Sequence, residues 1–505
     1  MASLVLVACS AEPGVVTGGA RQSPTGALSP SSPSTTDTTT PDDTTPGDTT
    51  PGDTTPSTEP PGSSTPDPTT TPVEDLIDEG DAKSARDYDD FLLLALDDIQ
   101  RWWAEQFPAL YGDPFDPLRG GVYAAYPERT EPIPGCGGAP ETTYEQITEF
   151  AAFYCPDGDF LVYDDGEDGV LFSLTEEFGP TILGVVMAHE FGHAIQARSG
   201  ALRRDLATIV TEQQADCFAG AWVAHAVNGG STTLELTDDD VRIGLVAMIT
   251  VRDPIGVDQF SEGGHGSAFD RVGAFQVGFT DGVERCAELI DNPLPLVPNV
   301  LQMDSNPQGN APFGYGDREI VGLISDDLNE FWPRAVAAAG SELPSLTVVP
   351  LESSNEIECD DPAGNLATGA VYCAATRQVY LDEPLAVQLY ERFGDFVVGY
   401  ILGGAWSEAV QQALESPLAG EDRALLSDCL TGAWASDLIP DAQGNTTRNN
   451  AQIEAGDLDE AIRTALLVGD ESSTDDVLGS GFEKIASFRE GVLGGIDACT
   501  DQLPD

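Results

Sequence analysis

The chain of 505 residues repeats itself, and this repeat constrains its fold more than any other feature. Trp103 is matched by Trp332, and the Gly-Ala-Trp motif ending at Trp222 is matched by the same motif ending at Trp434. The spacing between matched residues falls from 229 for the first pair to 212 for the second, so small gaps align the two copies. Repeated sequence indicates repeated supersecondary units. We therefore expect two related domains, for which the chain is long enough.

The cysteines follow the same repeat. Eight of the nine fall into the two copies, four in each, and Cys9 stands apart. The simplest pairing joins the first with the second and the third with the fourth in each copy. It predicts the disulfides Cys136–Cys155, Cys217–Cys286, Cys359–Cys373 and Cys429–Cys499. An even number of such cysteines indicates an oxidising compartment outside the cytoplasm.

The first copy alone contains a His-Glu-x-x-His motif, formed by His189, Glu190 and His193. Residues 180–199 are apolar and begin with Pro180, which suits the first position of a helix. One helical turn separates the two histidines, so both imidazoles can reach one tetrahedral zinc ion. Glu190 lies about 100° further round the helix, where a general base can act at the open metal position. Chance occurrence of the motif is the alternative.

A second predicted helix, residues 205–228, supplies a third ligand. Glu212 follows His193 by 19 residues, which leaves room for a loop and a return turn. Asp216 lies one turn further on and can accept the free N–H of a ligand histidine. Cys217 is the alternative ligand. It is disfavoured because its counterpart Cys429 persists in the copy that has no metal motif.

The second copy lacks this chemistry. Aligned with the first copy, it places Gly404, Ala405, Glu408 and Ala424 where the first has His189, Glu190, His193 and Glu212. No histidine follows His265. The sequence therefore predicts one Zn²⁺ per chain, bound by the first copy.

The segments His-Glu-Phe-Gly-His-Ala-Ile-Gln (189–196) and Glu-Gln-Gln-Ala-Asp-Cys-Phe-Ala-Gly-Ala-Trp (212–222) resemble the bacterial neutral zinc metallopeptidase family. These are zincins that use His-Glu-x-x-His and a distal Glu. Residues 153–156, 162–163 and 264–267 are also similar, and the resemblance covers about residues 85–290. It implies His189, His193 and Glu212 as zinc ligands and Glu190 as the catalytic base. The expected fold is α+β and mainly helical, with a zincin-like metallopeptidase domain followed by a degenerate, metal-free repeat.

The expected reaction is hydrolysis of a peptide or protein substrate by zinc-activated water, with Glu190 as general base. His265 lies in a glycine-rich loop and is the predicted catalytic donor to the oxyanion, with a plain surface-loop histidine as the alternative. His225 is expected at a helix end or on the surface. Arg271 either bridges an acidic neighbour or binds substrate. The strand at Phe160–Tyr163 is a candidate for lining the substrate cleft, with a plain core strand as the alternative.

Two other functions stay open. A cell-surface binding or scaffold protein could carry a vestigial zinc site, although a structural zinc usually has four protein ligands. The same zinc chemistry could also hydrolyse an amide of the cell wall instead of a peptide.

The start of the chain predicts attachment to a membrane. Leu6-Val7-Ala8-Cys9 fits a lipobox, so Cys9 is the expected lipidation site, although the signal is short and lacks a basic region. The location would then be the outer face of the bacterial cell membrane. The expected organisation is a remnant lipoprotein signal (1–9), a disordered Thr/Pro/Asp-rich linker (10–73), the metallopeptidase domain (74–315) and the degenerate repeat (316–505).

The charge balance excludes one class of partner. The chain has 86 acidic and 22 basic residues, giving a formal net charge of −64. Nucleic-acid binding needs lysine and arginine against phosphate, so no nucleic-acid partner is expected. The acidic surface favours a well-hydrated protein. Its oligomeric state is not predicted.

Overall fold

The computed structural model describes residues 76–148, 150–255, 257–261, 263–298, 314–315, 319–353, 357–360, 362–440, 453–454, 456–469 and 480–500. It is mainly helical, with 57% helix, 9% strand and only small sheets. The expectation of a mainly helical α+β protein is confirmed. The predicted signal (1–9), lipidation site Cys9 and linker (10–73) lie outside the described residues. The division at 315/316 stays a prediction.

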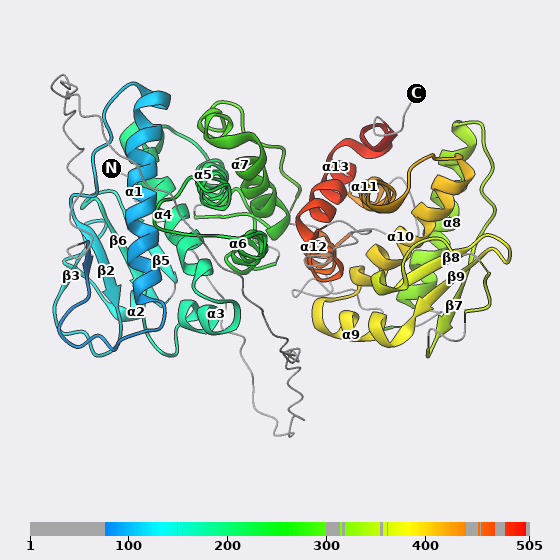
Figure 1. Cartoon of the computed structure of the whole chain (residues 1–505), viewed down its shortest axis with the longest axis horizontal. Coiled ribbons are helices and arrows are strands. Elements are labelled where there is room, and N and C mark those ends of the chain that lie inside the picture. Colours follow the sequence, from blue (N-terminus) through cyan, green and yellow to red (C-terminus); the bar gives the residue numbers. More distant parts are fainter. Residues whose placement is uncertain are drawn as a thin grey trace, which may run out of the picture. The chain divides into compact units, whose positions relative to one another are not determined.

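The first half, residues 74–315, contains helices that pack around a small sheet (Figure 1, blue to green). Its strands are β1 (Ile77–Asp78), β2 (Gly121–Ala125), β3 (Ile133–Pro134), β4 (Glu141–Thr142), β5 (Ala152–Cys155) and β6 (Phe160–Asp164). Its helices are α1 (Asp89–Tyr111), α2 (Tyr144–Ile147), α3 (Val170–Phe178), α4 (Thr181–Ser199), the 3₁₀ turn η2 (Ala201–Arg203), α5 (Thr208–Val227), α6 (Asp238–Thr250) and α7 (Ala268–Glu288).

The strand order of the sheet in this half determines which strand lies against α4, the helix with the His-Glu-x-x-His motif. Its order is β1-β2-β6-β5, with β6 parallel to β2 and antiparallel to β5. The strand expected to line a cleft, Phe160–Tyr163, is β6 and lies inside the sheet. The two edge strands are β1 and β5, and β5 contacts α4. All four residues of β5 are buried.

The second half, residues 316–505, repeats this architecture (Figure 1, yellow to red). Its elements are α8 (Ile320–Ala338), β7 (Thr347–Leu351), the 3₁₀ turn η4 (Leu366–Thr368), β8 (Ala370–Cys373), β9 (Gln378–Asp382), α9 (Glu383–Phe393), α10 (Phe396–Ala413), α11 (Gly420–Leu438), α12 (Asp457–Val468) and α13 (Gly481–Thr500). Its sheet has the order β7-β9-β8, with β9 parallel to β7 and antiparallel to β8. This is the arrangement of β2-β6-β5 in the first half.

Matched residues make matched contacts in the two halves. The buried indole Nε1 of Trp222 donates to Asp98 at 2.9 Å, and that of Trp434 donates to Asp327 at 2.9 Å. Glycines let α5 approach α7 and α11 approach α13. A Cβ at Gly220 or Gly432 would lie 2.0 Å from the backbone oxygen of Phe275 or Phe488, respectively. The sequence repeat is therefore also a repeat of three-dimensional contacts.

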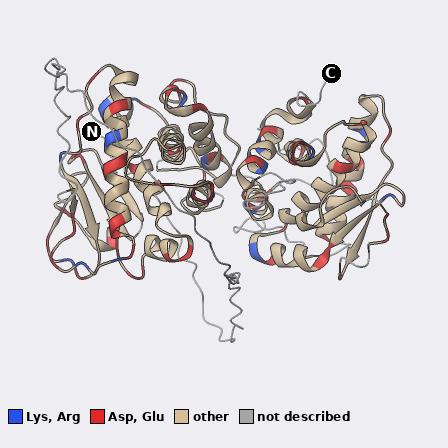
Figure 2. Ribbon diagram, viewed as in Figure 1, with Lys and Arg blue, Asp and Glu red and all other residues tan. Residues whose placement is uncertain are grey.

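Four disulfides close the structure, and they are the four predicted pairs: Cys136–Cys155, Cys217–Cys286, Cys359–Cys373 and Cys429–Cys499. They indicate an oxidising, extracytoplasmic location. Within the described ranges, no helix has the length and apolar character needed to cross a bilayer. Acidic residues are spread over the helices of both halves (Figure 2).

Candidate metal centre

The centre lies where α4 crosses α5. His189, Glu190 and His193 project from α4, and Glu212 comes from α5; all four are at most 1% exposed. The two helices approach closely because α4 has a glycine at the crossing. A Cβ on Gly192 would lie 2.9 Å from the Cα of Ala215 on α5. Gly192, which lies inside the His-Glu-Phe-Gly-His segment of α4, thus allows the close packing of the two helices.

The three predicted ligands converge on one point. The Nε2 atoms of His189 and His193 are 3.1 Å apart. The carboxylate of Glu212 lies 3.3 Å from the first and 3.4 Å from the second. One ligand atom from each residue lies within 4.8 Å of the other two. A single ion can therefore reach all three.

The hydrogen bonds behind the histidines fix which ring nitrogen faces the centre. Nδ1 of His189 lies 2.7 Å from Asp216 Oδ1, and Nδ1 of His193 lies 2.9 Å from Gln196 Oε1. Both partners are acceptors, because Gln196 uses its Nε2 to donate to the carbonyl of Thr211 at 2.6 Å. Each Nδ1 consequently carries the proton, and each Nε2 presents a lone pair. Neither oxygen of Glu212 has a hydrogen-bond donor.

This donor set fits a zinc ion. Two imidazole lone pairs and one carboxylate meet in a buried space, with no proton between them to hold them together. Imidazole nitrogen and carboxylate oxygen are ordinary zinc ligands, and three protein ligands leave one position for water. Such an arrangement of acceptors is repulsive unless a cation lies between them.

Arg271 supports the centre from α7. Its Nε donates to Asp216 Oδ2 at 2.8 Å and its Nη2 donates to Asp216 Oδ1 at 2.6 Å. Burial acts to raise the pKa of Asp216, but Arg271 and His189 outweigh it and hold that pKa below its ordinary value. Of the two roles left open for Arg271, the structure therefore shows the bridge to an acidic neighbour. Asp216 stays ionised and accepts the His189 proton.

Burial shifts the pKa values of the ionisable groups at the candidate metal centre. It raises the pKa of Glu190 to about 7 and lowers the pKa of His193 to about 4. Burial acts to raise the pKa of Glu212 as well, but the imidazoles of His193 and His265 outweigh it, and the pKa falls well below its ordinary value. Glu190 also accepts a hydrogen bond from the backbone of Tyr154 on the edge strand β5.

His265 belongs to this neighbourhood and is not a surface residue. It is 2% exposed, and its charge acts on both Glu190 and Glu212. Its Nδ1 lies 3.1 Å from Asp253 Oδ1, while Asp253 Oδ2 accepts the backbone N–H groups of His265 and Gly266, each at 2.8 Å. Its Nε2 is buried without a hydrogen-bond partner. Asp253 therefore fixes the loop and the ring together.

His225 lies at the other end of α5, away from the ligands. It is half-buried in the last turn of α5, and its ring centroid is 5.9 Å from that of Trp102. This is the helix-end role expected for it.

Two residues that orient side chains at the centre were not predicted from the sequence. The spacing of Gln196 could have indicated its role, because it follows His193 by about one helical turn and so shares its face. No spacing rule indicates Asp253, because it lies 12 positions before His265 and outside any shared helix.

The matching position of the second half holds ion pairs and an open cavity. Glu408 binds Arg423 at 2.6 Å and the hydroxyl of Ser427 at 2.8 Å. Asp428 accepts from Lys484 at 2.7 Å, as Asp216 does from Arg271. A cavity of about 400 Å³ is lined there by Gly404, Ala405 and Ala424, among others. The small side chains that replaced the motif left this space.

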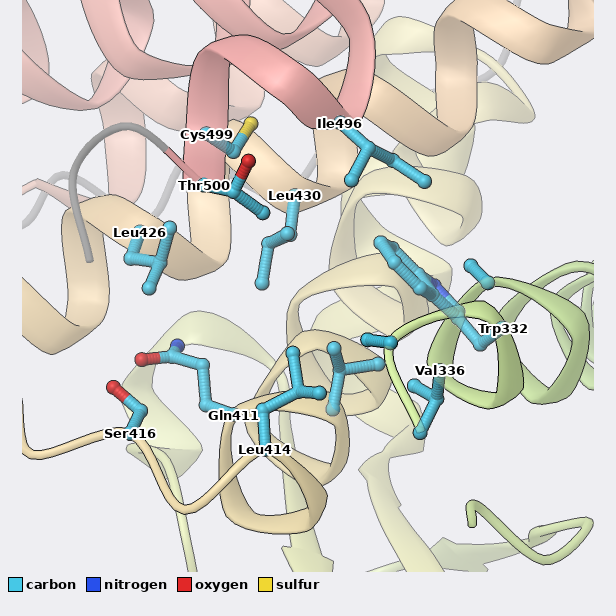
Figure 3. Close-up of a pocket in the computed structure, with 13 residues that line it drawn as sticks. Trp332, Val336, Gln411, Leu414, Ser416, Leu426, Leu430, Ile496, Cys499 and Thr500 are labelled. Carbon is cyan, nitrogen blue, oxygen red and sulfur yellow. The ribbon is translucent and has the colours of Figure 1, made fainter. Parts of the chain in front are cut away.

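A second cavity of the second half is apolar and small. It measures about 60 Å³ and lies between the ends of α8, α10, α11 and α13. Figure 3 shows Trp332, Leu414, Leu430 and Ile496 around it. The residues that line it are mainly apolar, so we interpret it as a packing defect of the core.

The comparisons with known proteins identify relatives but no function. No family model matches the chain. The chain is 32% identical over 170 residues to uncharacterized proteins of Mycobacterium bovis and of two strains of Mycobacterium tuberculosis. The match covers 29% of this chain, and the chain spans about half (55%) of the length of these relatives. No solved structure matches.

Proposed function

We propose that this chain is an extracytoplasmic zinc-dependent metallopeptidase, related to the bacterial neutral zinc metallopeptidases that its motifs resemble. One observation carries the proposal: the lone pairs of His189 and His193 and the carboxylate of Glu212 converge on a buried point. Glu190, the expected base, projects from the same helix turn. The four disulfides support the location.

The residues around the centre divide the proposed reaction between them. Bound zinc would polarise a water molecule and the substrate carbonyl. Glu190 accepts a proton from the water and passes it to the leaving amine. Asp216 and Arg271 hold His189 in the tautomer that presents Nε2.

His265 is assigned to the substrate and β5 to the base. When protonated at Nε2, His265 would donate from that nitrogen to the oxyanion, while Asp253 contacts Nδ1 on the other side of the ring. The edge strand β5 is buried along its length and contacts α4. The backbone of its Tyr154 donates to Glu190 and so helps to position the base.

A scaffold protein with a vestigial zinc site is less well supported. Among the described residues, the histidine group contains three ligands, whereas structural zinc sites have four. The base position is also occupied by an intact Glu190.

The test separates metal binding from hydrolysis. Glu190→Gln should keep one zinc per chain and lose hydrolysis of a peptide library by about 10²–10⁴-fold, because the base is lost while the ligands stay. His193→Ala should lose both zinc and activity. The matched control is Glu408→Gln, the second-half counterpart of His193, which should change neither.

Two results would contradict the proposal. If folded wild-type protein that has never been exposed to a chelator contains no zinc, the scaffold function would replace the proposed one. Cleavage of cell-wall fragments in place of peptides would retain the metal chemistry but change the substrate class.

The membrane anchor is part of the same proposal. Lipidation of Cys9 would attach the chain to the outer face of the membrane, with residues 10–73 as a spacer. A Cys9→Ser variant expressed behind a lipoprotein signal should move from the membrane fraction to the soluble fraction. An unchanged distribution would remove the anchor from the proposal.

A further inference from the structure

A second group of buried acids lies far from the histidines in sequence, in the second half of the chain. Asp395 directly precedes α10, and Asp457 and Glu460 lie in the first turn of α12. One carboxylate oxygen from each lies within 4.8 Å of the other two. None of the three residues is more than 5% exposed.

Backbone N–H groups fix the orientation of two of these carboxylates. Asp457 Oδ2 accepts the N–H of Glu454 at 2.8 Å, and Glu460 Oε2 accepts the N–H of Phe396 at 2.8 Å. Their other oxygens, Asp457 Oδ1 and Glu460 Oε1, are buried and have no hydrogen-bond partner. A buried acceptor without a donor is costly, so these two oxygens indicate that something else binds there.

The chain also leaves room beside one of these oxygens. Gly394 has a φ of 130°, which side chains rarely adopt, and a Cβ on it would lie 1.8 Å from Glu460 Oε1. Glycine is therefore required by the backbone, and it keeps the space at the unpartnered oxygen open.

The ends of two helices also favour negative charge at this place. The N-termini of α10 and α12 each contribute about half an elementary positive charge, and Arg463 attracts Glu460. These charges do not supply a hydrogen bond to Asp457 Oδ1 or Glu460 Oε1, which stay without a donor.

We propose that Asp395, Asp457 and Glu460 bind a calcium ion that joins the start of α10 to the start of α12. The ligand set consists of oxygen alone, which hard cations prefer and zinc does not. Calcium–oxygen distances of about 2.4 Å let two ligands on opposite sides of the ion lie about 4.8 Å apart, whereas magnesium needs a tighter, octahedral set.

The first half has no such group at the matching place. The helices α6 and α12 begin at Asp238 and Asp457, so Val241 occupies the position of Glu460. Pro180 precedes α4 where Asp395 precedes α10. The acids therefore belong to the half that lost the zinc motif, and this half, expected to be metal-free, would carry a metal of a different class.

The test measures the thermal stability of the full chain, freed of metal by a chelator, with and without calcium chloride. At a calcium concentration about a hundred times the dissociation constant, the unfolding temperature should rise by roughly 5 °C. Calorimetric titration should give one calcium per chain. Asp457→Asn and, separately, Glu460→Gln should abolish both signals. In chelator each variant should unfold no lower than wild type, because the amide oxygen can still accept the backbone N–H that the carboxylate oxygen accepts.

Two controls tie the response to this group. Asp422→Asn changes an exposed acid of the same half and should keep the full calcium shift. His193→Ala removes a proposed zinc ligand and should also keep it, so failure of the zinc proposal and failure of this one are distinguishable. A wild-type protein that takes up no calcium would overturn the proposal. A shift that survives in both Asp457→Asn and Glu460→Gln would do the same, as would an equal response to magnesium at the same concentration.

Discussion

Asp216 connects the ligand histidine to an arginine on another helix, and this makes it the most informative residue behind the centre. It accepts the Nδ1 proton of His189 and both donors of Arg271. We expect Asp216→Asn to lower zinc affinity by about 10–100-fold, because an amide cannot hold the histidine and the guanidinium together. Competition with a zinc chelator measures this loss.

The second half offers the matched control for that variant. Asp428 receives a hydrogen bond from Lys484 as Asp216 does from Arg271, but no zinc ligand lies beside it. Asp428→Asn should therefore leave zinc affinity unchanged in folded protein. If both variants lose zinc to the same extent, the effect is on stability and the role given to Asp216 is wrong.

Asp270 makes the stability of the protein depend on pH. It is 1% exposed, its Oδ1 accepts the N–H of Val297 at 3.2 Å, and its Oδ2 has no hydrogen-bond partner. Burial raises its pKa from 3.8 to about 7. The folded protein therefore holds this proton more tightly than the unfolded chain. Its stabilising effect is complete below pH 3.8 and is lost as the pH rises to about 7.

Asp270→Asn should remove that dependence. At pH 8 the variant should be more stable than wild type by on the order of 3 kcal/mol, and the difference should shrink as the pH falls toward 4. Denaturant unfolding at several pH values measures it. Asp281→Asn changes an exposed acid on the same helix, so its free energy of unfolding should follow that of wild type at every pH. Parallel curves for wild type and Asp270→Asn would refute the argument.

Single residues were predictable from the sequence where one helix sets their spacing. The relation of His189, Glu190 and His193 follows from 3.6 residues per turn, and the same rule could have found Gln196. Asp253 and Asp395 could not be found in this way. Their partners come from loops and helices that meet only after folding, and no short spacing indicates such a contact.

At the scale of elements, the disulfide between α5 and α7 holds the two helices that carry Asp216 and Arg271. Cys217–Cys286 closes 69 residues, and its counterpart Cys429–Cys499 closes 70. Loops of equal length should contribute equally to stability, about 4 kcal/mol each in the chain-entropy model. Replacing either pair by alanines should lower the unfolding temperature by similar amounts.

Zinc affinity should distinguish the two pairs. Only Cys217→Ala with Cys286→Ala loosens the helices behind His189, so only that double variant should bind zinc more weakly, by about tenfold. The Cys429 and Cys499 double variant should keep the wild-type affinity. Equal affinities in the two variants would show that the contact of Asp216 with Arg271 needs no covalent support.

The long apolar elements were predicted well because hydrophobic pattern and helix ends mark them. Residues 180–199 and 205–228 were expected as helices, and α4 and α5 occupy Thr181–Ser199 and Thr208–Val227. Of the two roles left open for Phe160–Tyr163, the structure shows that of a core strand. It belongs to β6, an inner strand whose five residues are all buried.

At the scale of the whole molecule, the two halves share the contacts that stabilise the fold and differ at the candidate metal centre. The second half keeps the disulfides, the indole-to-carboxylate bonds and the glycine contacts between helices. It replaces the ligand side chains by small ones and by ion pairs. The pairing of cysteines could be predicted because the repeat limits the choices. The packing of the helices around the former centre could not, because it depends on the volumes of many side chains at once.

The net charge of −64 leads to a prediction for the molecule as a whole. Acidic groups spread over the helices of both halves repel one another, and this repulsion destabilises the compact state (Figure 2). Salt shortens the screening length from about 10 Å at 0.1 M to about 3 Å at 1 M. In the presence of chelator, which removes any effect of bound metal, the unfolding temperature should therefore rise by several degrees between these sodium chloride concentrations. Potassium chloride should act alike, because screening depends on ionic strength and not on the identity of the cation. An unfolding temperature that stays constant or falls would show that the surface charges lie too far apart to repel one another strongly. The acidic composition would then contribute to hydration alone.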